Sequence, residues 1–190
     1  YFKMVKKNAC IFISGQGSNL KSLIENSRIY NFPIKISLVV SNNQNAKGIL
    51  YAKKNYIPYL IVKTKKRNFE HIILKKIKEH KISLICLAGY MKVLSKNFIN
   101  SCKNKIVNIH PSLLPKFKGL NTYKRILVNK ECKTGCSVHF VNEKLDGGKI
   151  INQKIFFIDE KDNIQSLREK TQKLERRTYA EAIIKIYRYN

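Results

Sequence analysis

Short apolar runs alternate along most of the chain with segments whose apolar residues recur at helical spacing. The runs predict buried strands over residues 9–14, 34–40, 59–62, 84–87 and 106–109. The segments between them carry one apolar stripe each, formed by Leu20, Leu23 and Ile24, by Ala46, Ile49 and Leu50, and by Phe69, Ile72, Ile73 and Ile77. Because strands that alternate with helices form parallel pairs with right-handed crossovers, the pattern predicts an α/β fold with a mostly parallel sheet and helices on both faces.

The pattern changes toward the end of the chain. Two strand-like segments, residues 134–141 and 149–158, flank a turn containing Asp146-Gly147-Gly148, which predicts a C-terminal antiparallel edge hairpin. A final helix is predicted over residues 164–187. The sequence shows no linker, repeat or low-complexity segment, so we expect one domain over residues 1–190, with residues 1–8 as a disordered N-terminal extension.

Composition narrows the class of protein. The 190 residues, of which 44% are hydrophobic, are enough for one buried core. No apolar run approaches the roughly 20 residues that cross a membrane, and the run over residues 9–13 is shorter than a signal-peptide core of about 7–15 residues. The five cysteines include no C-x-x-C pair and no zinc-ligand spacing. We therefore expect no metal site, no membrane partner and a cytoplasmic location.

The net charge of +26 is typical of proteins that bind polyanions. However, lysines outnumber arginines and are scattered over the whole chain, and Asn and Ile are abundant as well. A nucleic-acid surface more often clusters arginine between aromatic residues. We interpret the charge as compositional drift that also attracts small anionic ligands, and we do not expect nucleic-acid binding.

An amide, an imidazole and a hydroxyl lie within five residues in the segment Asn108-Ile109-His110-Pro111-Ser112. If residues 106–109 form a strand, Asn108 and His110 share a face at its end, where open α/β sheets place their ligands. An Asn donor beside a titratable His is suited to oxyanion stabilisation and proton transfer. The alternative is a strand end with a capping Asn and a buried His.

A glycine-rich segment, Ser14-Gly15-Gln16-Gly17-Ser18-Asn19-Leu20, joins the first strand to the first helix. Free N–H groups at a helix start favour a phosphate, and Leu20 occupies the third glycine position of a dinucleotide fingerprint. We therefore predict a monophosphate site. An ordinary tight turn with Ser18 or Asn19 as the helix cap is the alternative.

The C-terminal hairpin carries further polar side chains. Asp146 either forms a common Asp-Gly turn or lies near His110, where its carboxylate would raise the His pKa and favour the imidazolium. Ser137 and His139 share one strand face. His139 is either a core histidine or a brace for Asp146, and we favour the brace.

Four segments, in this order, resemble the glycinamide ribonucleotide (phosphoribosylglycinamide) formyltransferases of purine synthesis. The resemblance runs from about Ala9 to Ile186. Residues 13–20 look like the phosphate loop of that family and residues 87–95, LAGYMKVLS, look like its folate-facing segment. Residues 108–115, NIHPSLLP, and residues 135–148 look like its catalytic core.

The resemblance implies a Rossmann-like sheet with an antiparallel edge. It also implies transfer of a formyl group from 10-formyltetrahydrofolate, as co-substrate, to the amine of glycinamide ribonucleotide by a monomer or homodimer. By the same resemblance, Asn108 and His110 stabilise the oxyanion, and Asp146 orients or charges His110 and assists proton transfer through water. Further implied contacts are Gly17, Ser18 and Asn19 to the phosphate, Glu175 to the glycinamide end, and Met91, Lys92, Val93, Leu94, Val141, Asn142, Glu143, Lys144 and Leu145 to the folate.

Three positions depart from the family pattern: Lys92 stands where Arg is common, Asn121 where bacterial members often have His, and Gln16 where a smaller residue is usual. Lys92 keeps the charge but loses the planar fork of Arg. Two other functions stay open. Formyltetrahydrofolate deformylase shares the Asn–His–Asp logic but hydrolyses the formyl group, and a basic nucleic-acid-binding module could carry a disused active site.

Overall fold

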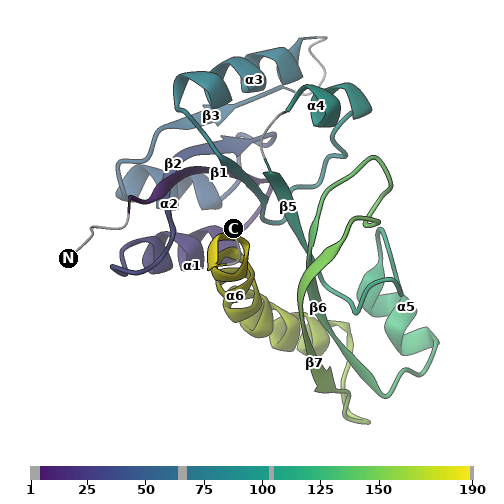
Figure 1. Cartoon of the computed structure of the whole chain (residues 1–190). Coiled ribbons are helices and arrows are strands. Elements are labelled where there is room, and N and C mark those ends of the chain that lie inside the picture. Colours follow the sequence, from purple (N-terminus) through teal and green to yellow (C-terminus); the bar gives the residue numbers. More distant parts are fainter. Residues whose placement is uncertain (1–4, 64–67, 103–104, 189–190) are drawn as a thin grey trace. The chain divides into compact units, whose positions relative to one another are not determined.

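The computed structural model of the chain describes residues 5–63, 68–102 and 105–188 (Figure 1). Contacts between Cα atoms divide the chain into two compact units, residues 1–107 and residues 108–190. Strand β5 (Lys105–His110) begins in the first unit and ends in the second.

The first unit is a parallel sheet covered by helices. It contains the strands β1 (Lys7–Ile13), β2 (Ile34–Ser41), β3 (Tyr59–Ile61) and β4 (Leu84–Leu87), which run parallel in the order β3-β2-β1-β4. Its helices are α1 (Ser18–Ser27), α2 (Gly48–Lys54), α3 (Phe69–Glu79) and α4 (Lys96–Ser101). Figure 1 shows α1 and α2 on one side of these strands and α3 and α4 on the other.

The second unit combines the end of β5 with an antiparallel hairpin. Strands β6 (Lys133–Phe140) and β7 (Ile150–Phe157) pair antiparallel, and the strand order is β5-β6-β7. The short helix α5 (Thr122–Val128) precedes the hairpin, and the long helix α6 (Ile164–Arg188) packs against β6 and β7. The predicted α/β fold, with its mostly parallel sheet and antiparallel C-terminal edge, is confirmed.

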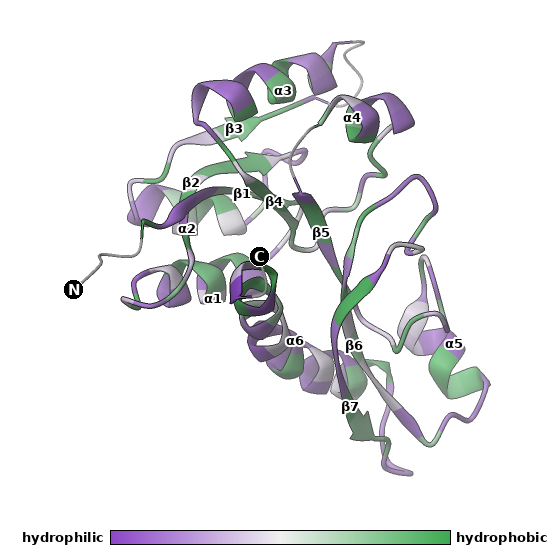
Figure 2. Cartoon of the chain, viewed as in Figure 1, coloured by the Kyte–Doolittle hydropathy of each residue, from purple (hydrophilic) through white to green (hydrophobic). Residues whose placement is uncertain are grey.

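Burial explains why the strands could be recognised. All four residues of β4 and the last five of β1 are buried, as expected for parallel strands covered on both faces. In Figure 2 these strands carry mostly the colour of hydrophobic residues. The edge strand β7 instead leaves several side chains in solvent, Ile155 and Phe157 among them. Along the described part of the chain, no helix is both long enough and apolar enough to cross a bilayer.

Some element boundaries and burial predictions differ from the structure. β1 begins at Lys7, so Lys7 and Asn8 lie in a strand rather than in the expected N-terminal extension, whose residues 1–4 lie outside the described residues. Leu50 and Ile72, predicted to lie in buried stripes, are 63% and 42% exposed. The other members of the two stripes are buried, Ala46 and Ile49 in the first and Ile73 and Ile77 in the second, except for the partly exposed Phe69.

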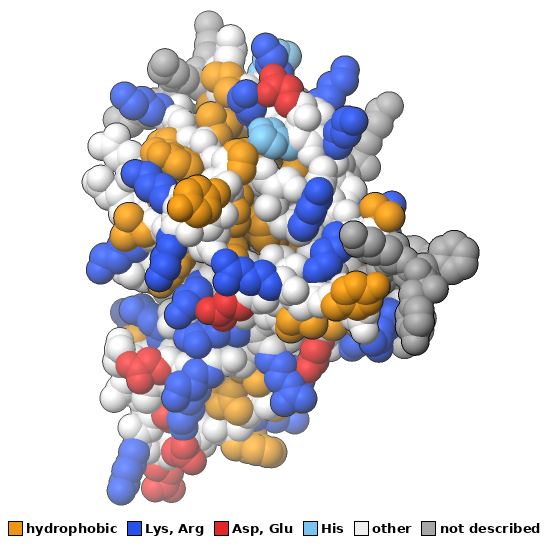
Figure 3. Space-filling view, turned by 90° about the vertical axis from the view of Figure 1, so that its left-hand side faces the viewer, with side chains coloured by type: hydrophobic (Ala, Val, Ile, Leu, Met, Phe, Trp, Pro, Cys, Tyr) orange, Lys and Arg blue, Asp and Glu red, His pale blue; other side chains and the backbone are white. Residues whose placement is uncertain are grey.

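Lysine and arginine side chains are scattered over the face of the molecule drawn in Figure 3, with hydrophobic and acidic side chains between them. They do not gather into one stripe on that face. This distribution matches the scattered lysines of the sequence.

Candidate active site

Strand β5 brings two polar side chains to one place at its carboxyl end. Its extended backbone puts Asn108 and His110 on the same face, because side chains alternate along a strand. Asn108 Nδ2 donates to Asp146 Oδ1 at 3.4 Å, and His110 Nδ1 lies 3.3 Å from Asp146 Oδ2. The structure thus brings together the three residues predicted to be catalytic, and all three lie in the second unit.

Asp146 is held with its side chain turned inward. Its backbone has a positive φ of 46° in the turn between β6 and β7, and only 8% of its side chain is exposed. Besides Asn108 and His110, the carboxylate accepts a hydrogen bond from the Gly119 N–H at 2.9 Å and lies 3.6 Å from His139 Nε2. Both carboxylate oxygens therefore have partners.

The electrostatics keep Asp146 ionised. Burial alone would raise the pKa of this carboxyl, but the contacts with His139 and the Gly119 N–H, together with the charge of His110, outweigh burial and lower the pKa to about 2. Asp146 is therefore an anion throughout the neutral range and a poor base by itself.

The predicted effect of Asp146 on the pKa of His110 has the expected direction, but burial of the ring outweighs it. Burial lowers the pKa of His110, and this effect exceeds the opposing influence of the Asp146 carboxylate and of the Phe117 carbonyl. The ring is only 7% exposed, so the imidazolium loses most of its hydration. Asp146 acts in the predicted direction, but it does not reverse the cost of burial.

The hydrogen bonds of His110 define its protonated nitrogen. A carbonyl oxygen only accepts, so the 2.9 Å contact between His110 Nε2 and Phe117 O requires a hydrogen on Nε2. In the neutral ring the lone pair then lies on Nδ1, which faces Asp146. A proton added to Nδ1 would be held directly by the carboxylate.

Ser137 and His139, on β6, hold neighbouring parts of the site through hydrogen bonds. Ser137 Oγ donates to Ser112 O at 2.6 Å and accepts from Leu114 N at 3.0 Å, so it holds the segment that follows β5. His139 Nδ1 contacts Phe140 O at 2.8 Å, and its Nε2 lies 3.2 Å from Asn108 Nδ2. Because the Phe140 carbonyl only accepts, Nδ1 donates to it, and Nε2 of the neutral ring accepts from Asn108 while lying 3.6 Å from Asp146 Oδ1. This geometry supports the predicted brace.

The partners supplied by residues 116–119 were not predicted. Phe117 contributes a carbonyl to His110, and Gly119 contributes an N–H to Asp146. Backbone groups leave no signature in residue types, since every residue other than proline carries both. The only local signal in the sequence is Gly119, whose φ of 77° lies in the left-handed region.

The glycine-rich segment has the backbone geometry of an anion site. Gly17 precedes α1 with φ 75°, and a Cβ there would lie 2.5 Å from the Cα of Gly48. No side chain caps the helix start, so the alternative of a Ser18 or Asn19 cap is not observed. Asn19 is 7% exposed. A left-handed glycine at the start of a ten-residue helix is compatible with a phosphate site, which stays a prediction.

The residues predicted to contact folate fall into two groups, one in each unit. In the first unit Met91 and Val93 are about 70% exposed, at 70% and 71%, Lys92 is exposed, and Leu94 is buried. In the second unit the segment 141–145 is a largely exposed loop in which Lys144 N donates to Asn142 Oδ1 at 3.0 Å; its members are Val141, Asn142, Glu143, Lys144 and Leu145. Their contact with folate stays a prediction.

Glu175 lies on α6 with 8% of its surface exposed. Burial, with the Glu175 charge acting in the same direction, raises the pKa of Cys136 to about 12, and this influence places the carboxylate close to β6. Its predicted role at the glycinamide end of the substrate also stays a prediction.

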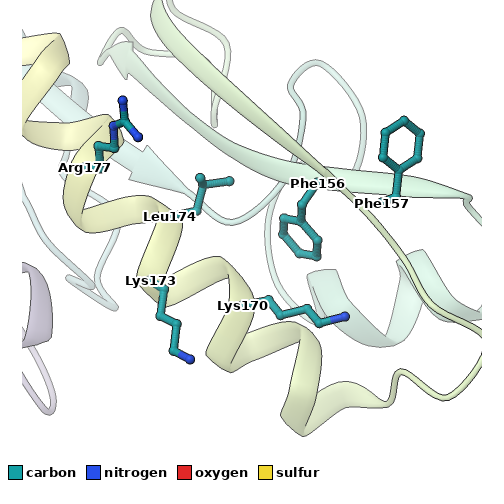
Figure 4. A pocket seen from close by; sticks show the side chains of 6 residues that line it. All are labelled: Phe156, Phe157, Lys170, Lys173, Leu174 and Arg177. Carbon is teal, nitrogen blue, oxygen red and sulfur yellow. The ribbon is translucent and has the colours of Figure 1, made fainter.

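A separate groove lies between β7 and α6 and has a volume of about 410 Å³. Figure 4 shows Phe156 and Leu174 turned toward the space between strand and helix, with Lys170 and Arg177 on the helix beside them. None of the predicted site residues lines this groove. Among the described residues, no cluster of three or more His, Cys, Asp or Glu side chains could hold a metal ion.

Comparison with known proteins gives consistent matches. The phosphoribosylglycinamide formyltransferase of Haemophilus influenzae is 40% identical over 179 residues, which cover 91% of this chain and 84% of that protein. The crystal structure of phosphoribosylglycinamide formyltransferase from Brucella melitensis superposes with a TM-score of 0.90 at 36% identity, covering 96% of each chain.

Longer relatives match as well. The trifunctional purine biosynthetic protein adenosine-3 of Chironomus tentans is 38% identical over 184 residues, and the chain spans only 13% of its length. The chain likewise spans 18% of the corresponding protein of Gallus gallus. The family model described as formyl transferase matches residues 7–183. With nearly its whole length covered, the chain belongs to the formyl transferase family.

Proposed function

We propose that this protein transfers a formyl group from 10-formyltetrahydrofolate to the amine of glycinamide ribonucleotide. The observation that carries the proposal is the convergence of Asn108, His110 and Asp146, at 3.3–3.4 Å, in a chain of the formyl transferase family. The reaction is a step of purine biosynthesis. We propose the cytoplasm as its location, in line with the cysteine pattern of the sequence.

The chemistry needs no covalent intermediate with the protein. The substrate amine attacks the formyl carbon, so a new C–N bond forms while the carbonyl oxygen becomes an oxyanion. The bond between the formyl carbon and the folate nitrogen then breaks, and the proton lost by the amine passes to that nitrogen. Stabilising the oxyanion and moving one proton are the two tasks of the site.

We assign oxyanion stabilisation to Asn108 and His110. The Asn108 amide is a neutral donor that Asp146 and His139 hold in orientation, at 3.4 and 3.2 Å. His110 already carries a hydrogen on Nε2, but that hydrogen is directed to Phe117 O. To donate it to an oxyanion, His110 must exchange the carbonyl for the substrate. Until the substrate takes its place, the carbonyl keeps the ring in the tautomer and orientation that carry the hydrogen on Nε2.

We assign proton transfer to Asp146 acting with water and with His110. A carboxyl with a pKa of about 2 does not retain a proton at neutral pH, so Asp146 stabilises a proton in transit rather than storing it. The Nδ1 atom of His110, 3.3 Å away, is the adjacent position where such a proton would be held.

The transferase and the deformylase proposals differ in their need for the amine. With both substrates, we expect rapid consumption of 10-formyltetrahydrofolate, because amine attack completes the transfer. Without glycinamide ribonucleotide, consumption should fall by at least about 10²-fold, the scale on which one misplaced reactant slows a reaction. The measurement is formate release and folate product formation, with and without the amine.

Formate release at a similar rate without the amine would favour the deformylase. If neither reaction occurs and the protein binds unrelated DNA with steep salt dependence, the nucleic-acid-binding module becomes the better proposal.

Phosphate binding at the N-terminus of α1 can be tested with a substitution that leaves the fold intact. Gly17 is a poor target, because a side chain there would collide with Gly48. We expect Ser18→Asp instead to raise KM for glycinamide ribonucleotide at least about tenfold, since a carboxylate repels the phosphate, while helix stability is kept or improved by the N-terminal acid. The KM for 10-formyltetrahydrofolate should change by less than about twofold.

Ser18→Asn is the matched control for this experiment, since it has nearly the same size and carries no charge. Equal losses for both substrates in Ser18→Asp, or the same loss in Ser18→Asn, would argue against a phosphate at this position.

A further inference from the structure

The segment 116–119, here named the 116–119 turn, is fixed through its carbonyl groups. Each of its four successive carbonyls accepts a hydrogen bond from a different side chain. The bonds reach Lys116 O from Ser112 Oγ (2.6 Å), Phe117 O from His110 Nε2 (2.9 Å), Lys118 O from Arg125 Nη1 (2.5 Å) and Gly119 O from Thr122 Oγ1 (3.1 Å). A change in the backbone conformation of this turn would therefore break at least one of these hydrogen bonds.

Two backbone groups of the 116–119 turn also hold the catalytic pair. The Phe117 carbonyl accepts from His110, and the Gly119 N–H donates to Asp146 at 2.9 Å. Lys118 lies between these two contacts. A shift of the turn would therefore displace the partners of His110 and Asp146 together.

The turn needs external support, because its backbone is not one that the residues prefer. Phe117 has φ 56°, in the left-handed region that side chains with a Cβ seldom adopt. Such a conformation costs of order 1–3 kcal/mol and persists only where the surroundings hold it in place. Of the four side chains that hold the carbonyls, Arg125 is the exposed and permanently charged one.

Arg125 contacts this strained segment in two ways. From α5, its Nη1 donates to Lys118 O, and its guanidinium carbon lies 5.5 Å from the centre of the Phe117 ring. A planar guanidinium can stack on an aromatic ring and donate in its own plane at the same time, which an ammonium cannot do. The two contacts hold adjacent residues of the turn.

We infer that Arg125 is a positioning residue: it holds the 116–119 turn in the conformation that presents the Phe117 carbonyl to His110 and the Gly119 N–H to Asp146. The inference rests on the proposed function of these two residues. Arg125 itself touches neither of them in the contacts described above, so its effect passes through the turn.

The charge of Arg125 has an additional, separable effect. Burial lowers the pKa of His110, and the positive charge of Arg125 acts in the same direction. Charge and geometry can be separated by two substitutions: Arg125→Gln removes both the charge and the guanidinium, whereas Arg125→Lys keeps the charge and loses the planar fork.

The test compares Arg125→Gln, Arg125→Lys and the control Lys124→Gln, a change of the neighbouring exposed residue. We expect kcat to fall about tenfold or more in both Arg125 variants, with each KM within about twofold, because the substrate contacts remain while the catalytic pair is misplaced. Lys124→Gln should match the wild type.

Two measurements on the ligand-free protein do not depend on activity. By NMR, amide hydrogen exchange of Gly119 should accelerate in both Arg125 variants, since the turn opens more often. The pKa of His110, followed through its ring signals, should rise in Arg125→Gln and change less in Arg125→Lys. A purely structural role would change neither the His110 titration nor kcat at constant KM.

The inference is overturned if kcat and Gly119 exchange in Arg125→Gln equal those of the wild type, or if Lys124→Gln causes the same losses. If Arg125→Gln does not fold, kcat and Gly119 exchange are measured in Arg125→Lys instead, and wild-type values there overturn the inference. Should the wild type show no formyl transfer, the proposed function fails, whereas Gly119 exchange and the His110 titration still decide the role of Arg125.

Discussion

Replacing His110 with alanine is expected to lower kcat for formyl transfer by about 10²–10³-fold, equivalent to the roughly 2.7–4 kcal/mol that one oxyanion donor contributes. The physical reason is that the Nε2 hydrogen, now held by Phe117 O, is the donor that the oxyanion would recruit. The KM values should change far less, because the loss falls on the transition state. Steady-state kinetics with both substrates provide the measurement.

The matched control is His71→Ala, since His71 is exposed on α3 and plays no part in the site. It should leave kcat unchanged. Circular dichroism and thermal unfolding must show that His110→Ala is folded, because the change removes a buried ring. A folded His110→Ala protein with more than about a third of the wild-type kcat would rule out the assigned role.

Most of the fold could be predicted because its buried strands appear in the sequence as short apolar runs. β4 is buried over its whole length, and its predicted limits, residues 84–87, agree with the structure. The short helices α4 and α5 were not predicted. Each of these helices buries one apolar side chain, Phe98 in α4 and Ile126 in α5, so neither shows an apolar stripe at helical spacing. For α4 a start signal existed, because Ser95 Oγ accepts from Phe98 N at 3.0 Å as an N-cap.

The side chains of the candidate site were predictable, whereas its electrostatic balance was not. Asn108, His110 and Asp146 belong to residue types whose chemistry limits their roles. The pKa of His110, by contrast, depends on how deeply the ring is buried and on which backbone groups surround it. Phe117 O contacts His110 and the Gly119 N–H contacts its partner Asp146, and neither backbone group has a signature in the sequence.

Arg125 is a residue whose role the sequence does not reveal. In the sequence it is one of many basic residues, consistent with compositional drift. Only the structure shows that its guanidinium lies over Phe117 and bonds to Lys118 O. Individual basic residues in a chain with scattered positive charge can therefore have specific structural roles. Their contacts in the structure reveal these roles, whereas the composition does not.

The second large effect concerns Asp146→Asn, which keeps the shape of the side chain and removes its charge. We expect kcat to fall by about 10²-fold or more, the usual range for losing a group that assists proton transfer. Because the Asp146 carboxylate raises the pKa of His110 against the effect of burial, its removal should lower that pKa further. An NMR titration of the His110 ring in the ligand-free variant measures this shift, and an unchanged or higher pKa would contradict the assigned contact.

The same substitution should change how stability depends on pH. The folded-state pKa of Asp146 is about 2, below the ordinary value of 3.8, so its ionised form stabilises the native protein above pH 3.8, and this stabilisation is lost as the pH falls toward 2. A shift of this size corresponds to about 2 kcal/mol. The wild type should therefore lose about 2 kcal/mol more unfolding free energy than Asp146→Asn across this interval, measured by urea unfolding.

Asp162→Asn separates acid stability from catalysis. Burial opposes ionisation of Asp162, but hydrogen bonds from Lys170 and Ser166 lower its pKa to about 2 as well, and it lies outside the candidate active site. This variant should also have a weaker pH dependence of stability, while kcat stays at the wild-type level. If Asp162→Asn reduced kcat as strongly as Asp146→Asn, loss of a stabilising carboxylate would explain both results. Because only Asp146 contacts Asn108 and His110, we expect kcat to fall in Asp146→Asn alone.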